Sequence, residues 1–326
     1  MKKTKAIALI SGGLDSVLAA KVISEQGIEV IGVTFITPFS GDGTSQRVKL
    51  LAKILNIDLR LLDISAEFFK MLKFPKYGYG KNLNPCIDCR ILELRQAHQL
   101  MKELGASFVV TGEVLGQRPM SQNRQSIELI ERESGMEGLI VRALCAKLLS
   151  PSIPEKEGWI NREELLDIEG RSRKKQYKLV EKYNISGYGA PAGGCLLTDS
   201  GFSLKVKNLM KSNMLDTDFI NLMKTGRYFS LSDSFKLVVG RDHKENLKLL
   251  QFAKEGDIIF EPESKGPVAI GRGKRENADL EIASKIVAYY CKNGPVNINV
   301  KIFPEDKEEI INAEKISGEE ILKYRV

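Results

Sequence analysis

Near its start the chain reads Ser11-Gly12-Gly13-Leu14-Asp15-Ser16. The apolar run before it, residues 6–10, is typical of a buried parallel strand, and the apolar periodicity of residues 17–26 predicts a helix after it. The turn therefore lies at a helix N-terminus, where free backbone N–H groups and the helix dipole favour an anion, and glycines let a phosphate approach closely. The pattern predicts a phosphate-binding turn.

The polar side chains of the turn indicate which phosphate compound it binds. Ser11 and Ser16 add hydroxyl donors. Asp15 is unfavourable beside a phosphate unless a cation bridges the two, and Mg²⁺ accepts carboxylate and phosphate oxygens together. Neither the Walker A pattern nor the dinucleotide pattern Gly-x-Gly-x-x-Gly occurs in this turn. We therefore expect a Mg-nucleotide site; the alternative is an ordinary strand-to-helix turn.

The composition is that of a globular protein with room for two domains. The chain has 326 residues, 43% of them hydrophobic, and no apolar run approaches the ~18 residues of a membrane span. Residues 1–5 lead straight into a strand without a secretion signal, so we expect a cytoplasmic protein without a membrane partner. The 49 Lys and Arg against 42 Asp and Glu give a charge of +7, which is compatible with a polyanionic partner but does not identify one.

Alternating strands and helices predict an α/β fold. Strand patterns at residues 28–35, 58–62 and 107–110 alternate with helix patterns at 46–55 and 90–104. This alternation predicts a doubly wound parallel sheet that binds ligands at the carboxyl ends of its strands, where Thr34, Phe35, Thr111 and Gly112 stand.

The pattern of predicted strands and helices changes in the second half of the chain. Shorter strand and helix patterns predict a smaller C-terminal α+β domain, with strands at 235–241, 257–260 and 297–302 and helices at 245–254 and 281–290. We predict a nucleotide-binding domain at 1–165, a connecting segment at 166–215 and the C-terminal domain at 216–326.

Five cysteines in a chain expected to be cytoplasmic favour metal or catalytic use over disulfides. Cys86 and Cys89 place two thiols within reach of one metal centre, and Cys195, which follows Gly193 and Gly194, adds a third. Three thiolates suit an iron–sulfur cluster with one open iron, whereas structural zinc needs a fourth ligand, and spacing does not settle the metal. A redox pair and simple buried cysteines are the alternatives. Cys145 and Cys291, in apolar runs, are expected in the core.

In combination these motifs resemble the PP-loop ATP pyrophosphatase superfamily, and within it the tRNA thiolation enzymes. Residues 11–16 are similar to the PP-loop, and Asn84-Pro85-Cys86 resembles the MnmA-type 2-thiouridylases. The segment Thr111-Gly112-Glu113-Val114-Leu115-Gly116-Gln117 resembles the ThiI-type 4-thiouridine synthases. The resemblance covers roughly residues 5 to 200.

The resemblance implies an enzyme that splits ATP between the α- and β-phosphates, adenylates a uracil carbonyl oxygen of tRNA and replaces that oxygen with sulfur, with 4-thiouridine favoured. It implies that Cys86, Cys89 and Cys195 act in catalysis, by holding a [4Fe-4S] cluster or by carrying a persulfide from a sulfur donor. It further implies that Asp15 positions Mg²⁺ and that the nucleotide is bound by Ser11, Gly12, Gly13, Asp15, Ser16, Thr34, Phe35, Thr111, Gly112 and Gln117.

Three alternatives remain open. The first is a persulfide-based 2-thiouridylase without a cluster, and the second is a PP-loop enzyme that adenylates a small molecule. The third is a non-catalytic RNA-binding or redox-sensing module that retains the nucleotide site.

ThiI-type enzymes carry an RNA-binding region ahead of the PP-loop, whereas the loop here begins at Ser11, so we expect the tRNA contacts elsewhere. The C-terminal part resembles the RNA-binding domain of the NFACT proteins in Val238–Arg241, in Asn246, in the strand pattern at 257–260 and in the helix pattern at 283–290. A purely structural or dimerising domain is the alternative, and a homodimer is a further expectation. The candidate RNA contacts are Arg171, Arg173, Lys174, Arg272, Lys274 and Arg275.

Overall fold

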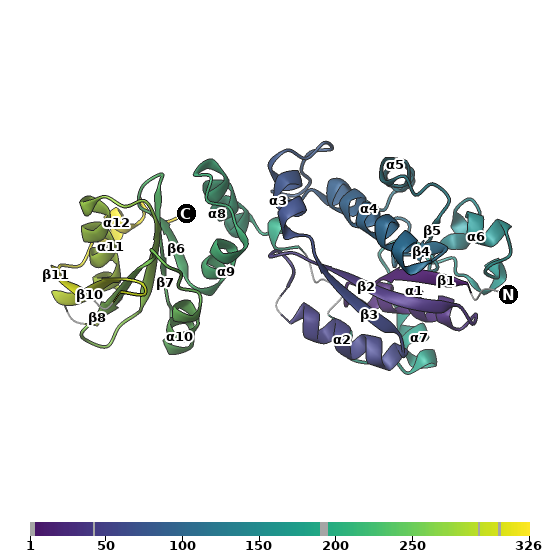
Figure 1. The fold of residues 1–326 in the computed structure, drawn as a ribbon, viewed down its shortest axis with the longest axis horizontal. Helices are drawn as coiled ribbons and strands as arrows, with labels where there is room; N and C mark the ends of the chain where they lie inside the picture. The colour runs from purple at the N-terminus through teal and green to yellow at the C-terminus, as the bar shows by residue number, and fades with distance from the viewer. Residues whose placement is uncertain (1–3, 42, 190–194, 293, 306–307) are drawn as a thin grey trace. The chain divides into compact units, whose positions relative to one another are not determined.

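The computed structural model describes residues 4–41, 43–189, 195–292, 294–305 and 308–326, and the chain divides into two compact units between Thr198 and Asp199 (Figure 1). The sequence predicts boundaries near 165 and 215 instead. Residues up to 189 stay with the first unit because Ile168 and Ile185 are buried in its core. The connecting segment is thus shared between the two units.

Within the described residues, the first unit holds a parallel sheet of five strands in the order β3-β2-β1-β4-β5. Its elements are β1 (Lys5–Leu9), α1 (Leu14–Ser24), β2 (Glu29–Ile36), α2 (Thr44–Leu55), β3 (Asp58–Asp63), α3 (Ser65–Lys73), α4 (Cys86–Leu104), β4 (Phe108–Val110), α5 (Arg124–Ser134), β5 (Ile140–Val141), α6 (Ile153–Lys156) and α7 (Lys174–Tyr183).

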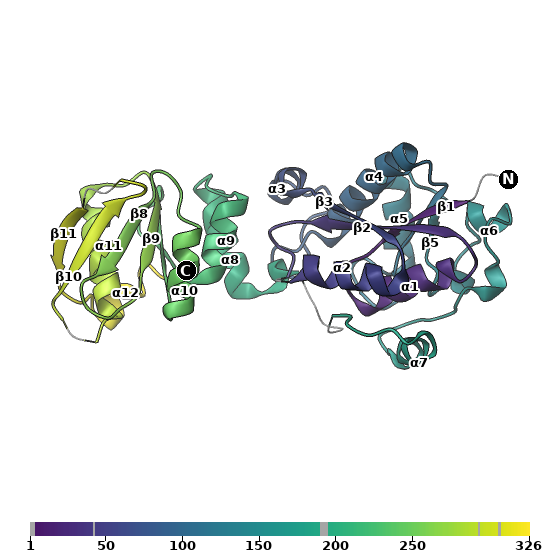
Figure 2. The same ribbon diagram turned by 60° about the horizontal axis from the view of Figure 1, so that its bottom comes forward.

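Helices cover both faces of this sheet, as Figure 2 shows. Side chains alternate along β1, so Ala6 and Ala8 join the core that α1, α2 and α7 cover, while Ile7 and Leu9 join the core under α4 and α5. A parallel sheet buried on both faces confirms the doubly wound α/β prediction.

Three local predictions change in this unit. Helix α4 begins at Cys86 rather than Arg90, so both cysteines of the Cys-x-x-Cys pair lie in its first turn. Helix α3 and the two-residue strand β5 were not predicted, because the first is short and the second carries too few residues to show a period.

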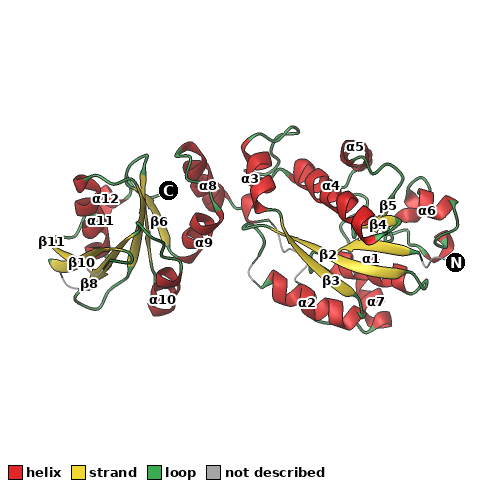
Figure 3. Ribbon diagram, in the orientation of Figure 1, coloured by secondary structure: helices red, strands yellow, loops and turns green. Residues whose placement is uncertain are grey.

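Within the described residues, the second unit is built on an antiparallel sheet of six strands in the order β11-β10-β8-β9-β7-β6 (Figure 3). Its elements are α8 (Ser200–Lys211), α9 (Thr217–Thr225), β6 (Arg227–Ser230), β7 (Phe235–Val239), α10 (His243–Gln251), β8 (Ile258–Pro262), β9 (Ala269–Gly273), α11 (Asn277–Tyr289), β10 (Val296–Ile302), β11 (Glu308–Ala313) and α12 (Gly318–Ile321).

Helices pack on both faces of this sheet as well. Phe229 of β6 joins the core under α11, while its neighbour Tyr228 contacts Phe219 of α9. The smaller α+β domain is confirmed. Arg272, one of the candidate RNA contacts, is a paired residue of β9.

Among the described residues, none of the helices combines the length and the apolar character that crossing a membrane requires.

Candidate nucleotide and thiol site

The candidate site lies where the strand order of the parallel sheet reverses. Strands β1 and β4 are neighbours, and their connections leave toward opposite sides of the sheet. Loops that follow two such strands diverge and leave a crevice at the carboxyl edge, which is where open α/β sheets bind ligands. The PP-loop, residues 11–16, follows β1, and Thr111-Gly112 follows β4.

The PP-loop is held in shape by its own serines. Ser16 Oγ accepts from the Ser11 backbone N–H at 3.2 Å and donates to the Gly13 carbonyl oxygen at 2.9 Å. Gly12 has φ of +78°, a conformation that favours glycine. Gly13 occupies the N-cap of α1, and no described side chain caps the helix there. The first turn of α1 therefore keeps N–H groups available for an anion.

Gly112 lies directly against the first turn of α1. A Cβ added to Gly112 would come within 2.4 Å of the Ser16 backbone nitrogen and 2.5 Å of the Asp15 carbonyl carbon. Glycine is required because the backbone after β4 packs on the backbone after β1. The sequence-predicted residues Asp15, Ser16 and Gly112 are thus brought together.

Asp15 is surrounded by side chains from two distant segments. Gln117 Nε2 donates to Asp15 Oδ2 at 2.7 Å, Gln176 Nε2 donates to Asp15 Oδ1 at 3.4 Å, and Arg173 Nη2 lies 3.9 Å from Asp15 Oδ2. Among the described residues, Gln176 Oε1 and Arg173 Nε are buried without a hydrogen-bond partner. A ligand beside Asp15 could satisfy both atoms.

Gln176 was missed by the sequence analysis. It is fully buried at the start of α7, close in sequence to Arg171, Arg173 and Lys174, the basic residues that the sequence analysis selected. An amide among lysines carries no periodic or motif signal, so its contact with Asp15 appears only in three dimensions. Arg173 was predicted as an RNA or phosphate contact, and it lies beside Asp15.

A further segment lies against the PP-loop from the far end of this unit. The Gly189 backbone N–H donates to the Gly12 carbonyl oxygen at 2.8 Å, and a Cβ at Gly189 would lie 3.0 Å from Nη1 of Arg47. The predicted Gly193 and Gly194 fall outside the described residues.

Thr34 and Phe35 have packing contacts here. The Thr34 hydroxyl is buried and donates to the Ile10 carbonyl oxygen at 2.6 Å, which joins β2 to the end of β1. Phe35 is partly buried against the cluster that contains Val33 and Ile91. Both stand at the carboxyl end of β2 next to the crevice.

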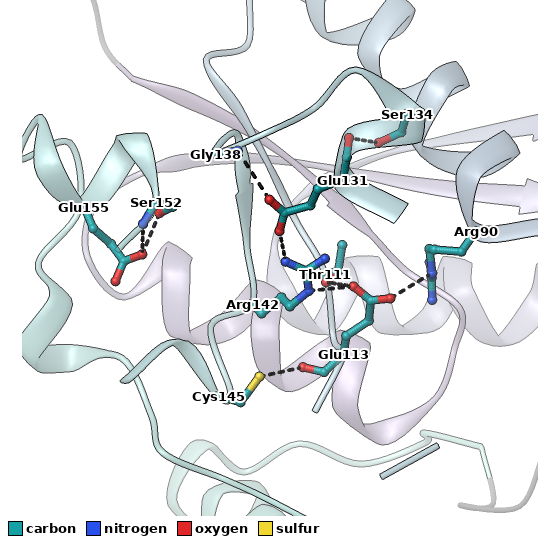
Figure 4. A network of polar contacts seen from close by, with 10 residues as sticks. All are labelled: Arg90, Thr111, Glu113, Glu131, Ser134, Gly138, Arg142, Cys145, Ser152 and Glu155. Atoms are coloured by element: carbon teal, nitrogen blue, oxygen red, sulfur yellow. Dashed lines mark hydrogen bonds and ion pairs between the residues drawn. The ribbon is translucent and has the colours of Figure 1, made fainter. Parts of the chain in front are cut away.

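Glu113 is the centre of a buried ionic network rather than a free carboxylate (Figure 4). It accepts from Thr111 Oγ1 at 3.0 Å and Arg142 Nε at 3.0 Å, and its other oxygen lies 3.2 Å from Arg90 Nε. Arg142 also pairs with Glu131. Burial raises the pKa of Glu113, but Arg142 and Arg90 outweigh it, so the pKa lies below its ordinary value. The network fixes the loop after β4.

The three predicted site cysteines converge although Cys195 is distant in sequence. Cys86 and Cys89 lie in the first turn of α4. The Leu83 N–H donates to the Leu197 carbonyl oxygen at 3.2 Å, and Asn82 Nδ2 donates to the Thr198 carbonyl oxygen at 2.7 Å. Two bonds therefore fasten the loop before α4 to the residues just after Cys195. Cys145 and Cys291 are buried in the cores, as predicted.

Burial and, to a lesser extent for Cys89 and Cys195, the neighbouring thiols raise the pKa values of the three cysteines. Burial raises the pKa of Cys86, Cys89 and Cys195, that of Cys195 to about 11. Cys86 raises the pKa of both other thiols, and Cys195 raises that of Cys89. Within the described part of the chain, however, His, Cys, Asp and Glu side chains make no group of three that could hold a metal ion.

Two consecutive residues follow the Thr-Gly-Glu segment toward Asp15 and the thiols. Gln117 donates to Asp15. Burial raises the pKa of Cys86 and Cys195, and the charge of the next residue, Arg118, offsets part of that rise. Arg118 carries no motif signal and was also missed.

Two family models match this chain. Residues 1–147 match the model described as "Thiamine biosynthesis protein (ThiI)", and residues 226–325 match that of the "NFACT protein RNA binding domain". Neither model covers the segment with Arg173, Gln176 and Cys195.

Curated relatives match part of this chain. The tRNA-specific 2-thiouridylase MnmA of Pelobacter propionicus is 33% identical over 116 residues, which is 33% of this chain and 33% of the relative. The "Probable tRNA sulfurtransferase" of Thermococcus kodakarensis is 30% identical over 138 residues, 40% of this chain and 35% of the relative. The chain thus spans about one third of the length of the curated relatives it matches.

Among solved structures, a 4-thiouridine synthetase–RNA complex with bound ATP is 23% identical, with a TM-score of 0.38, and covers 56% of this chain and 40% of that chain. The match of the first unit to the ThiI model agrees with its PP-loop, its Thr-Gly-Glu segment and its parallel sheet. Residues 1–147 are thus similar to the ThiI family and residues 226–325 to the NFACT RNA-binding domain, and the curated relatives named above are tRNA thiolation proteins.

Proposed function

We propose that this chain is an ATP-dependent tRNA sulfurtransferase that adenylates a uracil carbonyl oxygen and replaces it with sulfur. The supporting observations are the contact of Gln117 with Asp15 in the phosphate-binding turn and the hydrogen bonds of Leu83 and Asn82, which join the loop before Cys86 to the residues after Cys195. ATP activation followed by sulfur transfer needs those two centres side by side. The sulfurtransferase and 2-thiouridylase relatives point to the same chemistry.

In the first step the uracil carbonyl oxygen attacks the α-phosphorus of ATP. A new P–O bond forms, the bond to the bridging oxygen breaks, and pyrophosphate leaves with the electron pair. The uncapped first turn of α1 and the hydroxyls of Ser11 and Ser16 would bind the phosphate charge that develops. Asp15 would hold Mg²⁺, which in nucleotide sites needs only one or two carboxylates besides phosphate and water.

In the second step sulfur attacks the activated carbon. With hydrosulfide, a C–S bond forms, the C–O bond to AMP breaks, AMP leaves with the electron pair and the sulfur loses its proton. With a persulfide, the terminal sulfur attacks instead and a second cysteine then displaces the carrier sulfur. That route leaves a disulfide, which an external thiol must reduce.

The three cysteines would supply thiolates, the donors that a [4Fe-4S] cluster takes. The bonds of Leu83 and Asn82 hold the residues after Cys195 against the loop that leads to Cys86. Burial raises the pKa of each thiol, so iron would have to stabilise the thiolates. Such a cluster would supply an iron without a protein ligand for binding sulfide. The persulfide route, with the same cysteines, is the second candidate, and the MnmA relatives favour it.

We favour 4-thiouridine over 2-thiouridine as the product. The Thr-Gly-Glu segment resembles the ThiI type, and its last residue, Gln117, is the one that donates to Asp15. The RNA-binding domain at residues 226–325 supports tRNA as substrate. Lys274 and Arg275 are exposed and available to phosphates, whereas Arg272 is buried against Asp257 with bonds of 2.8 and 2.7 Å, so its predicted RNA contact is withdrawn.

The test is an assay of protein purified without oxygen, after iron and sulfide analysis. Incubation with unmodified tRNA, Mg-ATP and sulfide should give AMP, pyrophosphate and thiouridine in equal amounts. Asp15→Ala should abolish AMP release, and Cys195→Ser should abolish thiolation while the core variant Cys291→Ser keeps it. Formation of ADP, or AMP release that persists in Asp15→Ala, would contradict the proposal. Full activity of iron-free protein with persulfide donors would rule out the cluster and favour the persulfide route, and it would leave the proposed adenylation step unchanged.

A further inference from the structure

The loop between α3 and α4 presents two aromatic rings to solvent. Phe74 is 87% exposed and Tyr79 is 38% exposed, whereas Phe68, six residues before Phe74 and within α3, is buried. A phenylalanine gains little from so much contact with water, and two exposed rings in one short loop are more informative than one. We call residues 74–81 the aromatic loop.

The backbone of the aromatic loop is held at several points. Asp88 is buried and accepts from the backbone N–H groups of Lys76 at 2.9 Å and Tyr77 at 3.0 Å. The Tyr79 hydroxyl donates to the Leu72 carbonyl oxygen at 2.5 Å, and the Gly80 N–H donates to that of Asn84 at 2.8 Å. The rings therefore stand on a fixed support, which lowers the entropy that a stacking partner must overcome.

The bonds to Asp88 fasten the aromatic loop to the start of α4. Asp88 is the second x of the Cys-x-x-Cys pair, between Cys86 and Cys89 in the first turn of that helix. The aromatic loop is thus attached to the helical turn that carries two of the residues proposed to supply sulfur.

The segment that carries the rings is basic in sequence. Residues 70–81 contain Lys70, Lys73, Lys76 and Lys81 and no Asp or Glu. Lys70 and Lys81 are exposed, while Lys76 pairs with Glu133 at 2.7 Å and keeps most of its side chain in solvent. Aromatic rings among lysines form the combination that binds single-stranded nucleic acid, because bases stack on the rings and phosphates approach the ammonium groups.

We propose that the aromatic loop is an RNA-binding surface, on which Phe74 stacks with an unpaired base next to the target uridine and Lys81 contacts the adjacent phosphates. This inference rests on the proposed function and adds to it the part of the first unit that holds the tRNA. A uridine must leave its stack to reach an enzyme site, and a ring that takes over the stacking of a neighbouring base offsets part of that cost.

The test compares the full chain with Phe74→Ala, Phe74→Trp and the control Ile54→Ala, which removes an exposed side chain, 40% accessible, from α2. The Kd for unmodified tRNA is measured without ATP over a range of salt concentrations. Phe74→Ala should weaken binding about tenfold with an unchanged salt dependence, and Phe74→Trp should restore it. Lys81→Ala should weaken binding and reduce the salt slope by about one.

Equal tRNA affinity in Phe74→Ala and Ile54→Ala would overturn the inference. If Phe74→Ala also kept its rate with inorganic sulfide but lost it with a persulfide carrier protein, the surface would belong to that carrier. Neither result touches the proposed function, which fails separately if the unaltered chain makes no thiouridine. Each variant must have the melting temperature of the unaltered chain. If Phe74→Ala is less stable, the tRNA affinity of Phe74→Trp decides instead, and a Kd equal to that of the unaltered chain supports the inference.

Discussion

At the scale of single residues, Asp15 is the side chain on which the contacts of the candidate nucleotide site converge. Its carboxylate touches Gln117 and Gln176 and faces Arg173, so it is positioned and partly neutralised before any ligand binds. A carboxylate held in one place favours Mg²⁺ because less side-chain entropy is lost on binding.

Arg173→Ala should raise the KM for ATP about tenfold, because the change removes the cation that faces Asp15 and a donor to phosphate. Arg171, two residues earlier and exposed, is the matched control, and Arg171→Ala should leave the KM unchanged. Isothermal titration of each variant with Mg-ATP checks the affinity directly. Equal affinities of the two variants would show that Arg173 has no part in nucleotide binding.

Gly112→Ala should lower the free energy of unfolding by about 1–3 kcal/mol and reduce ATP affinity, because a Cβ would lie 2.4 Å from the Ser16 nitrogen and force the first turn of α1 to move. In Gly41→Ala the nearest atom to the new Cβ is Thr44 Oγ1 at 3.8 Å, an ordinary contact, so that control should be nearly neutral. Urea unfolding and nucleotide titration measure the two effects. A neutral Gly112→Ala would contradict the close packing of the two loops.

At the scale of elements, the buried network joins four of them at their ends. Arg90 comes from α4, Glu113 follows β4, Glu131 comes from α5 and Arg142 follows β5. A broken buried pair leaves an uncompensated charge, so the network ties the position of the Thr-Gly-Glu loop to the stability of the unit.

Glu113→Gln should cost about 3–5 kcal/mol of stability at pH 7, because Arg142 and Arg90 lose their buried partner. The folded pKa of Glu113 lies below its unfolded value of about 4.3, so its contribution is fully present above that value and is lost as the pH falls through the folded pKa. The difference in the free energy of unfolding between the variant and the unaltered protein should therefore decrease below about pH 4. Urea unfolding at several pH values measures it.

Glu133→Gln is the control for that experiment, because Glu133 pairs with Lys76 near the surface and should show little effect. If the loss of unfolding free energy in Glu113→Gln stayed constant down to acid pH, packing rather than charge would stabilise the network.

At the scale of the whole molecule, the chain holds two compact units with separate hydrophobic cores. Each of them buries its own sheet against its own helices, so each is expected to unfold as a cooperative unit.

Unfolding of the full chain should therefore show two transitions, and Mg-ATP should raise the midpoint of only one of them. At a ligand concentration 100 times the Kd, the first unit should gain about 2.7 kcal/mol. The one tryptophan of the chain, Trp159, packs against Phe108 in the first unit, so its fluorescence follows that unit, while circular dichroism follows both. A single transition that shifts as a whole with Mg-ATP would contradict independent units.

The amino-acid sequence by itself determined the strand, glycine turn and helix of the PP-loop, the parallel α/β sheet and the smaller second domain, because local periodicity and turn chemistry act over a few residues. Tertiary structure alone decided that Gln176 and Arg173 face Asp15, that Glu113 is a structural ion and that Arg272 is buried against Asp257. Asp15 and Gln176 are 161 residues apart, and a contact between such side chains leaves no period in either segment. It forms only when the sheet and α7 are packed, since burial is what makes a polar partner necessary.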